Sequence, residues 1–206
     1  MFIICRSPKG GVGTSVVAAA IAVQSAHAGA DTLLIDLAGD QPDLLGVRPP
    51  EFGVTDWLGG TDVPLDGLAA LELDVAPRLR LLARGAAPTV DRLDVLGGVC
   101  AAARRTVVVD AGVCADAHWA AGQAEEIVVL RACYLAVRRA GSVPSSTRLV
   151  VIEEPGRALR AADVAAALGV PVWRRLLLDP AVARSVDAGL LGARLPRSLR
   201  SLDLTA

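Results

Sequence analysis

The stretch over residues 7–15 reads Ser7-Pro8-Lys9-Gly10-Gly11-Val12-Gly13-Thr14-Ser15. A short apolar run, Phe2–Cys5, precedes it, and a run rich in Ala and Val, residues 16–23, follows it. Glycines between a strand and a helix let backbone N–H groups turn inward around phosphate oxygens. The helix that follows then points its positive end at the same oxygens. This layout predicts a phosphate-binding loop.

The loop matches the strict phosphate-loop pattern only in part. That pattern is Gly, any four residues, Gly, Lys and then Ser or Thr. Gly13 and Ser15 match it, whereas Pro8 stands in place of the first Gly and Thr14 in place of the Lys. Of the 21 basic residues, Lys9 is the only lysine, so the loop keeps one ammonium group while the rest of the chain uses Arg.

A closer match is a variant of the phosphate loop. Lys9-Gly10-Gly11-Val12-Gly13, with Ser15, resembles the deviant Walker A motif KGGxGK[ST] of the ParA/MinD family. Members of that family are P-loop ATPases that position plasmids, division sites and pili. The resemblance implies that Lys9 reaches across a dimer to the partner's nucleotide. It also implies that Thr14 replaces the lysine that holds the β- and γ-phosphates of its own subunit. The nucleotide-binding residues implied are Lys9, Gly10, Gly11, Val12, Gly13, Thr14 and Ser15.

A second family motif is only half kept. Family members carry a strand that ends in Asp-x-Asp, and residues 33–41 occupy that place here. Asp36 keeps the first carboxylate, but Ala38 stands where the resemblance expects the Asp that orients or activates the attacking water. Asp40 takes over that role only if the loop bends. We therefore assign no catalytic residue from the sequence.

The third motif is an acidic end to a central strand. Thr106–Asp110 fits a Walker B strand, although by itself Asp110 could equally cap the turn that follows. Combined with the loop, the nucleotide-site interpretation is favoured. The resemblance then implies that Ser15, Asp36 and Asp110 hold Mg²⁺ when ATP binds, and that ATP and Mg²⁺ bind weakly or not at all.

Short β-branched runs alternate with Ala- and Leu-rich helical stretches along the chain. Strands that are apolar on both faces and separated by helices predict an α/β fold of the P-loop NTPase type, a mostly parallel sheet with helices on both faces. The expected strands are 2–5, 32–35, 79–83, 106–109, 127–130, 148–152 and 170–174. The expected helices are 15–28, 89–103, 115–124, 132–140, 161–168 and 180–188. Residues 46–76 are expected to form a surface excursion with short helices near 56–58 and 65–71.

The composition of the chain argues against DNA binding and against a metal site built from Cys and His. The net charge is −1, so the balance of charge does not favour DNA, and the paired arginines at 138–139 and 174–175 are interpreted as solvated faces. Four separated cysteines and two histidines show no metal-site spacing.

No secretory signal and no apolar run long enough to span a membrane is visible in the sequence. We therefore expect a cytoplasmic protein, which reaches a cell pole or a membrane surface only through its partners. The Leu- and Arg-containing C-terminus, residues 195–204, is expected to pack on the body rather than enter a membrane.

Segments outside the glycine loop resemble one branch of the ParA/MinD family. The succession of residues 53–58, 79–85 and 170–183 looks like actinobacterial CpaE-like proteins, relatives of TadZ and of the septum-site-determining Ssd proteins. We expect one domain over residues 1–206, without an N-terminal receiver-like domain. The expected function is a dimeric pseudo-ATPase scaffold that helps place a pilus or secretion apparatus, or a septum. An active ParA/MinD-type ATPase and a P-loop transferase for a small molecule stay open as alternatives.

Overall fold

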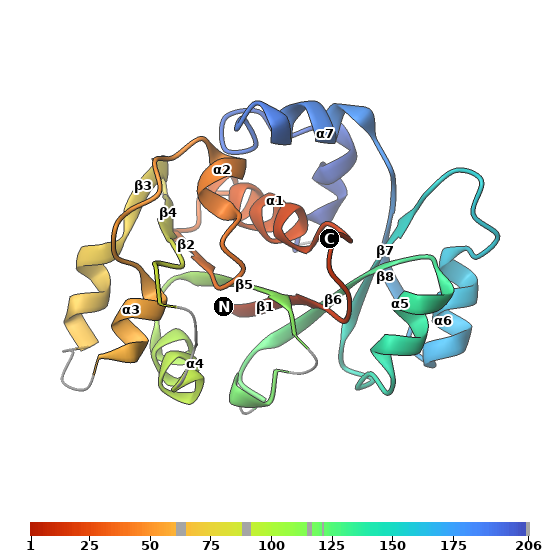
Figure 1. Ribbon diagram of the computed structural model, residues 1–206, viewed down its shortest axis with the longest axis horizontal. Helices are drawn as coiled ribbons and strands as arrows, with labels where there is room; N and C mark the ends of the chain where they lie inside the picture. The colour runs from red at the N-terminus through yellow and green to blue at the C-terminus, as the bar shows by residue number, and fades with distance from the viewer. Residues whose placement is uncertain (61–64, 88–91, 115–116, 121, 205–206) are drawn as a thin grey trace.

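The computed structural model describes residues 1–60, 65–87, 92–114, 117–120 and 122–204. Within these residues, eight strands form one sheet in the order β3-β4-β2-β5-β1-β6-β7-β8 (Figure 1). Every neighbouring pair is parallel except β3 and β4. The strands are β1 (Phe2–Ser7), β2 (Thr32–Asp36), β3 (Leu73–Ala76), β4 (Leu79–Leu82), β5 (Thr106–Val113), β6 (Glu125–Arg131), β7 (Arg148–Glu153) and β8 (Val172–Leu177).

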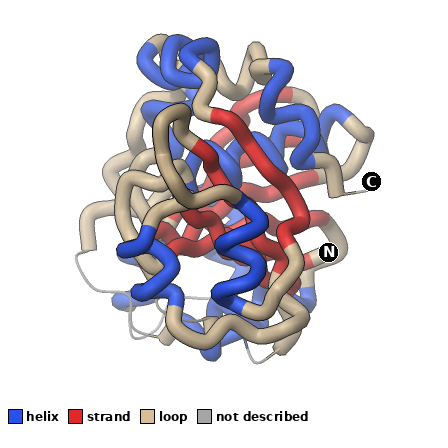
Figure 2. The backbone as a smooth tube through the Cα atoms, turned by 90° about the vertical axis from the view of Figure 1, so that its right-hand side faces the viewer, coloured by secondary structure: helices blue, strands red, loops and turns tan. Residues whose placement is uncertain are grey.

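Helices cover both faces of this sheet, as Figure 1 and the side view in Figure 2 show. One face carries α1 (Thr14–His27), α2 (Gln41–Leu45), α7 (Pro180–Asp187) and the 3₁₀ helix η3 (Arg197–Leu202). The other face carries α3 (Val54–Gly59), α4 (Leu93–Ala102), α5 (Tyr134–Ala140), α6 (Ala161–Leu168) and the 3₁₀ helices η1 (Leu65–Leu71) and η2 (His118–Ala120). The predicted fold class is confirmed.

The core follows from the period of two along each strand. On β1, Ile3 and Cys5 pack toward α1, whereas Phe2 and Ile4 pack toward the opposite layer. Because both sets are apolar, the strand has to be covered on both sides. The central helix α1 is buried over most of its length, which explains why its sequence is apolar nearly all round rather than striped.

Two elements were not expected from the sequence, one of them within the irregular segment 46–76. Residues 73–76, expected in a surface excursion, form β3, which pairs antiparallel with β4 through a tight turn at Pro77 and Arg78. Residues 41–45 form α2, with Pro42 in its first turn and Gly46 ending it at φ +67°. Pro in the first turn and a left-handed Gly after the last are typical helix boundaries.

One predicted helix is wrong. Of residues 115–124, the structure describes 117–120 and 122–124, and only His118–Ala120 form a helix there, a single 3₁₀ turn. Gly122 at φ +73° ends it, and Trp119 packs near Phe2 with ring centroids 6.3 Å apart. The predicted helix over 89–103 begins at Leu93 in the structure, and residues 89–91 lie outside the described part of the chain. The last strand is shifted to Val172–Leu177.

Candidate nucleotide-binding site

The glycine loop lies where strand order reverses in the sheet. It connects β1, which has β5 on one side and β6 on the other, to the N-terminus of α1. Gly11 at φ +70° and Gly13 at φ +95° supply the left-handed turns that a loop of inward-facing N–H groups needs. The Ser7 Oγ lies 3.1 Å from the Lys9 carbonyl and 3.2 Å from the Gly112 carbonyl, which ties the loop to β5. The backbone therefore has the shape of an anion-binding loop.

The loop has the backbone shape of a phosphate loop but lacks the positive side chain that the strict pattern places at position 14. Thr14 is the first residue of α1 and is only 6% exposed, so it presents a small buried hydroxyl where the strict pattern has an ammonium group. The Lys9 Nζ lies 3.5 Å from the Gly10 carbonyl, folded against its own loop. Phosphates placed here would meet peptide N–H groups and the helix end rather than a lysine from the start of α1.

The two acidic strand ends lie side by side next to this loop. Asp36 and Asp110 are opposite each other in the register of β2 and β5, and Asp110 is opposite Cys5 of β1. Both carboxylates are fully buried. The structure thus brings together Asp36, Asp110 and Ser15, the three residues predicted from the sequence as metal ligands.

Asp36 is engaged by its own loop. Its Oδ1 accepts hydrogen bonds from the N–H groups of Ala38 (3.0 Å) and Gly39 (2.6 Å), and its Oδ2 accepts one from Gln41 N (3.0 Å). Burial, and to a smaller extent the neighbouring Asp110 charge, raise the pKa of Asp36 to about 6 against the lowering effect of these three bonds. Asp36 therefore organises the turn that leads into α2.

Asp110 is engaged by Gln41. Its Oδ1 accepts from Gly112 N at 3.1 Å, and its Oδ2 accepts from Gln41 Nε2 at 2.8 Å. Burial raises the pKa of Asp110, and hydrogen bonds from the side chains of Gln41 and Ser15 oppose that rise. No signal in the sequence pointed to this role of Gln41, because a Gln between Asp and Pro is typical of an ordinary turn.

The turn after β2 also brings Asp40 to the loop. Gly39 has φ +104°, and the bend places Asp40 Oδ2 3.3 Å from the Ser15 Oγ. The bend that the sequence analysis set as a condition is therefore present, although Asp40 contacts Ser15 rather than standing at Ala38. On the other side of the turn, Arg84 Nη1 donates to the Ala38 carbonyl at 3.2 Å.

The same architecture occurs in solved structures. A ParA family ATPase from Chlorobium tepidum superposes with a TM-score of 0.79 at 21% identity, over 97% of this chain and 95% of that one. The chain has the fold of the ParA and MinD ATPases. MinD complexed with Mg-ADP from Pyrococcus horikoshii gives a TM-score of 0.73 at 19% identity, covering 98% of this chain and 93% of that one. MinD in a MinC:MinD complex from Aquifex aeolicus gives 0.73 at 19%, covering 98% and 92%.

The likeness to ParA and MinD is one of fold. No protein-family model matches this sequence, and no curated protein matches it. The identities of 19–21% leave the chemistry of the site to be argued from its own residues.

Mg²⁺ does not fit the side chains as they are arranged. In P-loop NTPases the ion is held by the loop Ser or Thr and by the Walker B Asp. Here Ser15 bonds Asp40, and Asp110 is occupied by Gln41 and Gly112. In the described part of the chain, no three His, Cys, Asp or Glu side chains are grouped so as to hold a metal. Asp110 Oδ2 can face a metal ion directly only if Gln41 moves away from it.

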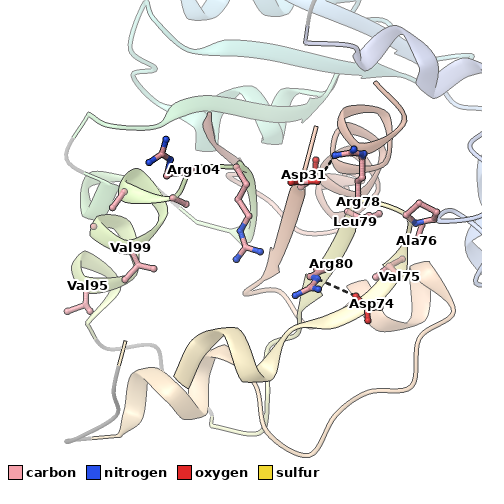
Figure 3. Close-up of a pocket in the computed structure, with 16 residues that line it drawn as sticks. Asp31, Asp74, Val75, Ala76, Arg78, Leu79, Arg80, Val95, Val99 and Arg104 are labelled. Atoms are coloured by element: carbon pink, nitrogen blue, oxygen red, sulfur yellow. Dashed lines mark hydrogen bonds and ion pairs between the residues drawn. The ribbon is translucent and has the colours of Figure 1, made fainter. Parts of the chain in front are cut away.

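A large cavity lies at the opposite edge of the sheet, near the first residues of β2 and β4. It has a volume of about 1320 Å³, and residues of α4, β3 and β4 line it (Figure 3). Its charged side chains largely pair with carboxylates nearby: Arg78 with Asp31 at 2.8 Å, and Arg80 with Asp74 at 3.3 Å. We therefore place the candidate function at the glycine loop rather than in this cavity.

The C-terminal segment packs on the body, as predicted. Leu199 and Leu202 of η3 are buried against α1, and Gln24 Nε2 donates to the Leu199 carbonyl at 3.2 Å. Arg174, expected on a solvated face, is instead partly buried, stacks on Trp173 at 4.5 Å and hydrogen-bonds the Ser201 carbonyl. Across the described residues, no helix combines the length and apolar character needed to cross a membrane.

Proposed function

We propose that this chain is a pseudo-ATPase of the ParA/MinD type that serves as a homodimeric positioning scaffold. In this proposal it binds ATP weakly or not at all and hydrolyses it very slowly or not at all. Its place is the CpaE/TadZ-like branch, and its partners are proteins of a pilus, a secretion apparatus or the division machinery. The fold shared with ParA and MinD supports the class of protein, and the residues of the loop support the loss of turnover.

The observation that carries this proposal is a built loop without the lysine expected at position 14. The backbone of residues 9–15 has the turns of a phosphate loop, yet the position of the phosphate lysine holds the buried Thr14. Ala38 likewise offers a methyl group where the family motif has a carboxylate. Phosphoryl transfer depends mostly on positioning and electrostatic stabilisation, so losing both groups should affect turnover more than binding.

A second copy of the chain is the proposed partner at the loop face. Several large apolar side chains are exposed at or just beyond the carboxyl ends of the parallel strands: Val113, Tyr134, Leu135, Leu177 and Leu178. The carboxyl ends of parallel strands lie at one edge of a sheet, which is the edge that carries the glycine loop. Exposed apolar groups that gather at one edge favour association there.

The binding claim is tested by titrating the purified protein with a fluorescent ATP analogue, beside Thr14→Lys. A hydrogen bond to a charged group contributes about 1.5–3 kcal/mol, so Thr14→Lys should tighten binding roughly 10- to 150-fold. Thr14→Ser is the matched control, because it changes the side chain and adds no charge. Equally tight binding by wild type and Thr14→Lys would contradict the proposal.

The alternative is an active ATPase, and one contact favours it. Asp40 places a carboxylate 3.3 Å from the Ser15 Oγ, so the site has an exposed acidic group next to the loop despite Ala38. In that case Asp40→Asn should abolish turnover, whereas the scaffold proposal expects no measurable turnover to lose. Comparing ATP hydrolysis by wild type and Asp40→Asn separates the two.

A further inference from the structure

Gln41 occupies an unusual position for an uncharged side chain. It is fully buried, and its Nε2 donates to Asp110 Oδ2 at 2.8 Å and to the Ser15 carbonyl at 3.0 Å. Its backbone N–H donates to Asp36 Oδ2 at 3.0 Å. One residue therefore links the ends of β2 and β5 to the start of α1.

The surroundings hold Gln41 in this place. It is the first residue of α2, and Pro42 restricts the backbone directly after it. The next turn of α2 is anchored by Leu44 and Leu45, which are buried in the core shared with α1. The side chain therefore starts from a helix that is packed into the core.

The side-chain amide of Gln41 supplies hydrogen-bond donors to Asp110, as the waters of a hydrated metal ion would. A Mg²⁺ ion keeps several of its waters, and those waters donate hydrogen bonds to nearby carboxylates. The Nε2 group of Gln41 offers two N–H donors, and both are used, one on Asp110 and one on the Ser15 carbonyl. The other end of the amide, Oε1, is buried and has no hydrogen-bond partner among the described residues. A buried acceptor left unpaired is costly, so this arrangement is held by the contacts of the nitrogen and by packing.

We propose that Gln41 is a built-in stand-in for the metal. Its amide binds the carboxylate of Asp110 from within the chain, so the site keeps its shape without Mg²⁺ and shuts the ion out. The inference deepens the proposed function and rests on it, because it concerns the same site. Its test needs no nucleotide, so it can fail separately from any result on ATP binding or hydrolysis.

The test measures the binding of Mn²⁺ alone, by calorimetry and by thermal unfolding with and without the ion. Mn²⁺ takes oxygen ligands, as Mg²⁺ does. The variant Gln41→Glu has nearly the same shape and replaces the donor with a carboxylate beside Asp110 and Asp36. Gln41→Ser is shorter, frees Asp110 Oδ2 and leaves room for water. Gln123→Glu, at an exposed position outside the site, is the control for the change of charge.

The wild type and Gln123→Glu should show no specific Mn²⁺ site and no rise in melting temperature. Gln41→Glu should bind Mn²⁺ at least about tenfold more tightly than the wild type, because metal affinity follows the number of charged ligands. Its melting temperature should fall in chelator and recover with Mn²⁺. If Gln41→Glu folds poorly, Gln41→Ser serves as the second variant. It too should bind Mn²⁺ more tightly than the wild type. A specific Mn²⁺ site in the wild type would overturn the inference, and so would a failure of both variants to bind better than the wild type.

Discussion

Arg6, the penultimate residue of β1, shows how the glycine loop is held at the scale of single side chains. It is almost completely buried, pairs with Glu126 of β6 and donates to the Cys114 carbonyl at 3.3 Å. Thr147 also bonds Glu126, at 3.2 Å. A charge taken out of water needs such a partner, and here the pair links β1, β6 and the end of β5 directly below the loop.

Glu126→Ala should therefore lower the free energy of unfolding by about 3 kcal/mol, because it leaves the Arg6 charge buried without its carboxylate. Chemical denaturation checks this value. Glu154→Ala is the control, since Glu154 pairs with the half-exposed Arg157 and should cost less than about 1 kcal/mol. Equal losses in the two variants would show that the buried pair does not support the loop.

Single residues also mark the limit of sequence reasoning at the site. Lys9, Gly13, Ser15 and Asp110 could be placed at the loop from the sequence, because a strand, a glycine turn and a helix fix their order in space. The role of Gln41 could not, since its contacts with Asp110 and Ser15 span 69 and 26 positions of the chain. Contacts of that kind depend on how α2 packs, and no local pattern shows this.

At the scale of elements, the turn between β2 and α2 should make stability depend on pH. The pKa of Asp36 is raised to about 6 by burial, above its value of 3.8 in an unfolded chain. A raised pKa means that the folded state holds the proton more tightly, so this contribution is greatest below about pH 4 and is lost as the pH rises through about 6. The upper limit of the loss is on the order of 3 kcal/mol.

Asp36→Asn removes the titrating group and keeps one acceptor for the turn. The free energy of unfolding of the wild type, relative to this variant, should fall between about pH 4 and about pH 7 and then level off. Denaturation curves at several pH values measure it. A difference that stays constant across this range, or that grows with pH, would contradict the assigned environment of Asp36.

The C-terminal helix η3 gives a second prediction at this scale. Leu202 is fully buried against α1, so Leu202→Ala should cost about 2–5 kcal/mol of stability. If the segment served instead as a membrane anchor, the variant would fold normally and lose binding to anionic lipid vesicles. Thermal unfolding together with vesicle sedimentation distinguishes the two.

The elements also show why part of the fold was predictable. Strands buried on both faces, such as β5 and β6, appear as unbroken apolar runs whatever their neighbours are, so the sequence alone reveals them. Strand β3 is only four residues long, lies at the sheet edge and is only partly buried, in a segment that carries several Pro and Gly residues. The helix expected over 115–124 reads as helical by composition, but packing of Trp119 and the left-handed Gly122 limit it to one turn in the described residues.

At the scale of the whole molecule, the exposed apolar side chains at the loop edge predict self-association. Leu135→Asp should convert a dimer into a monomer in sedimentation experiments, because it places a charge on one of the large apolar side chains exposed at this edge. Leu190→Asp is the control, as Leu190 is similarly exposed but lies beyond the far end of α7. A wild type that stays monomeric at high concentration, with and without ATP, would contradict the proposed dimer.

The proposal to be tested is that a chain with the fold of the ParA and MinD ATPases carries a phosphate-type loop that does not turn over ATP. ATP hydrolysis is followed over several hours with Mg²⁺, for the wild type and for Thr14→Lys/Ala38→Asp/Gln41→Ser, in which the Gln41 amide no longer occupies Asp110. We predict that phosphate release by the wild type stays at the background measured without protein, while the triple variant releases phosphate above that background. Repeated turnover by the wild type that Lys9→Ala abolishes would contradict the account and establish an active ATPase.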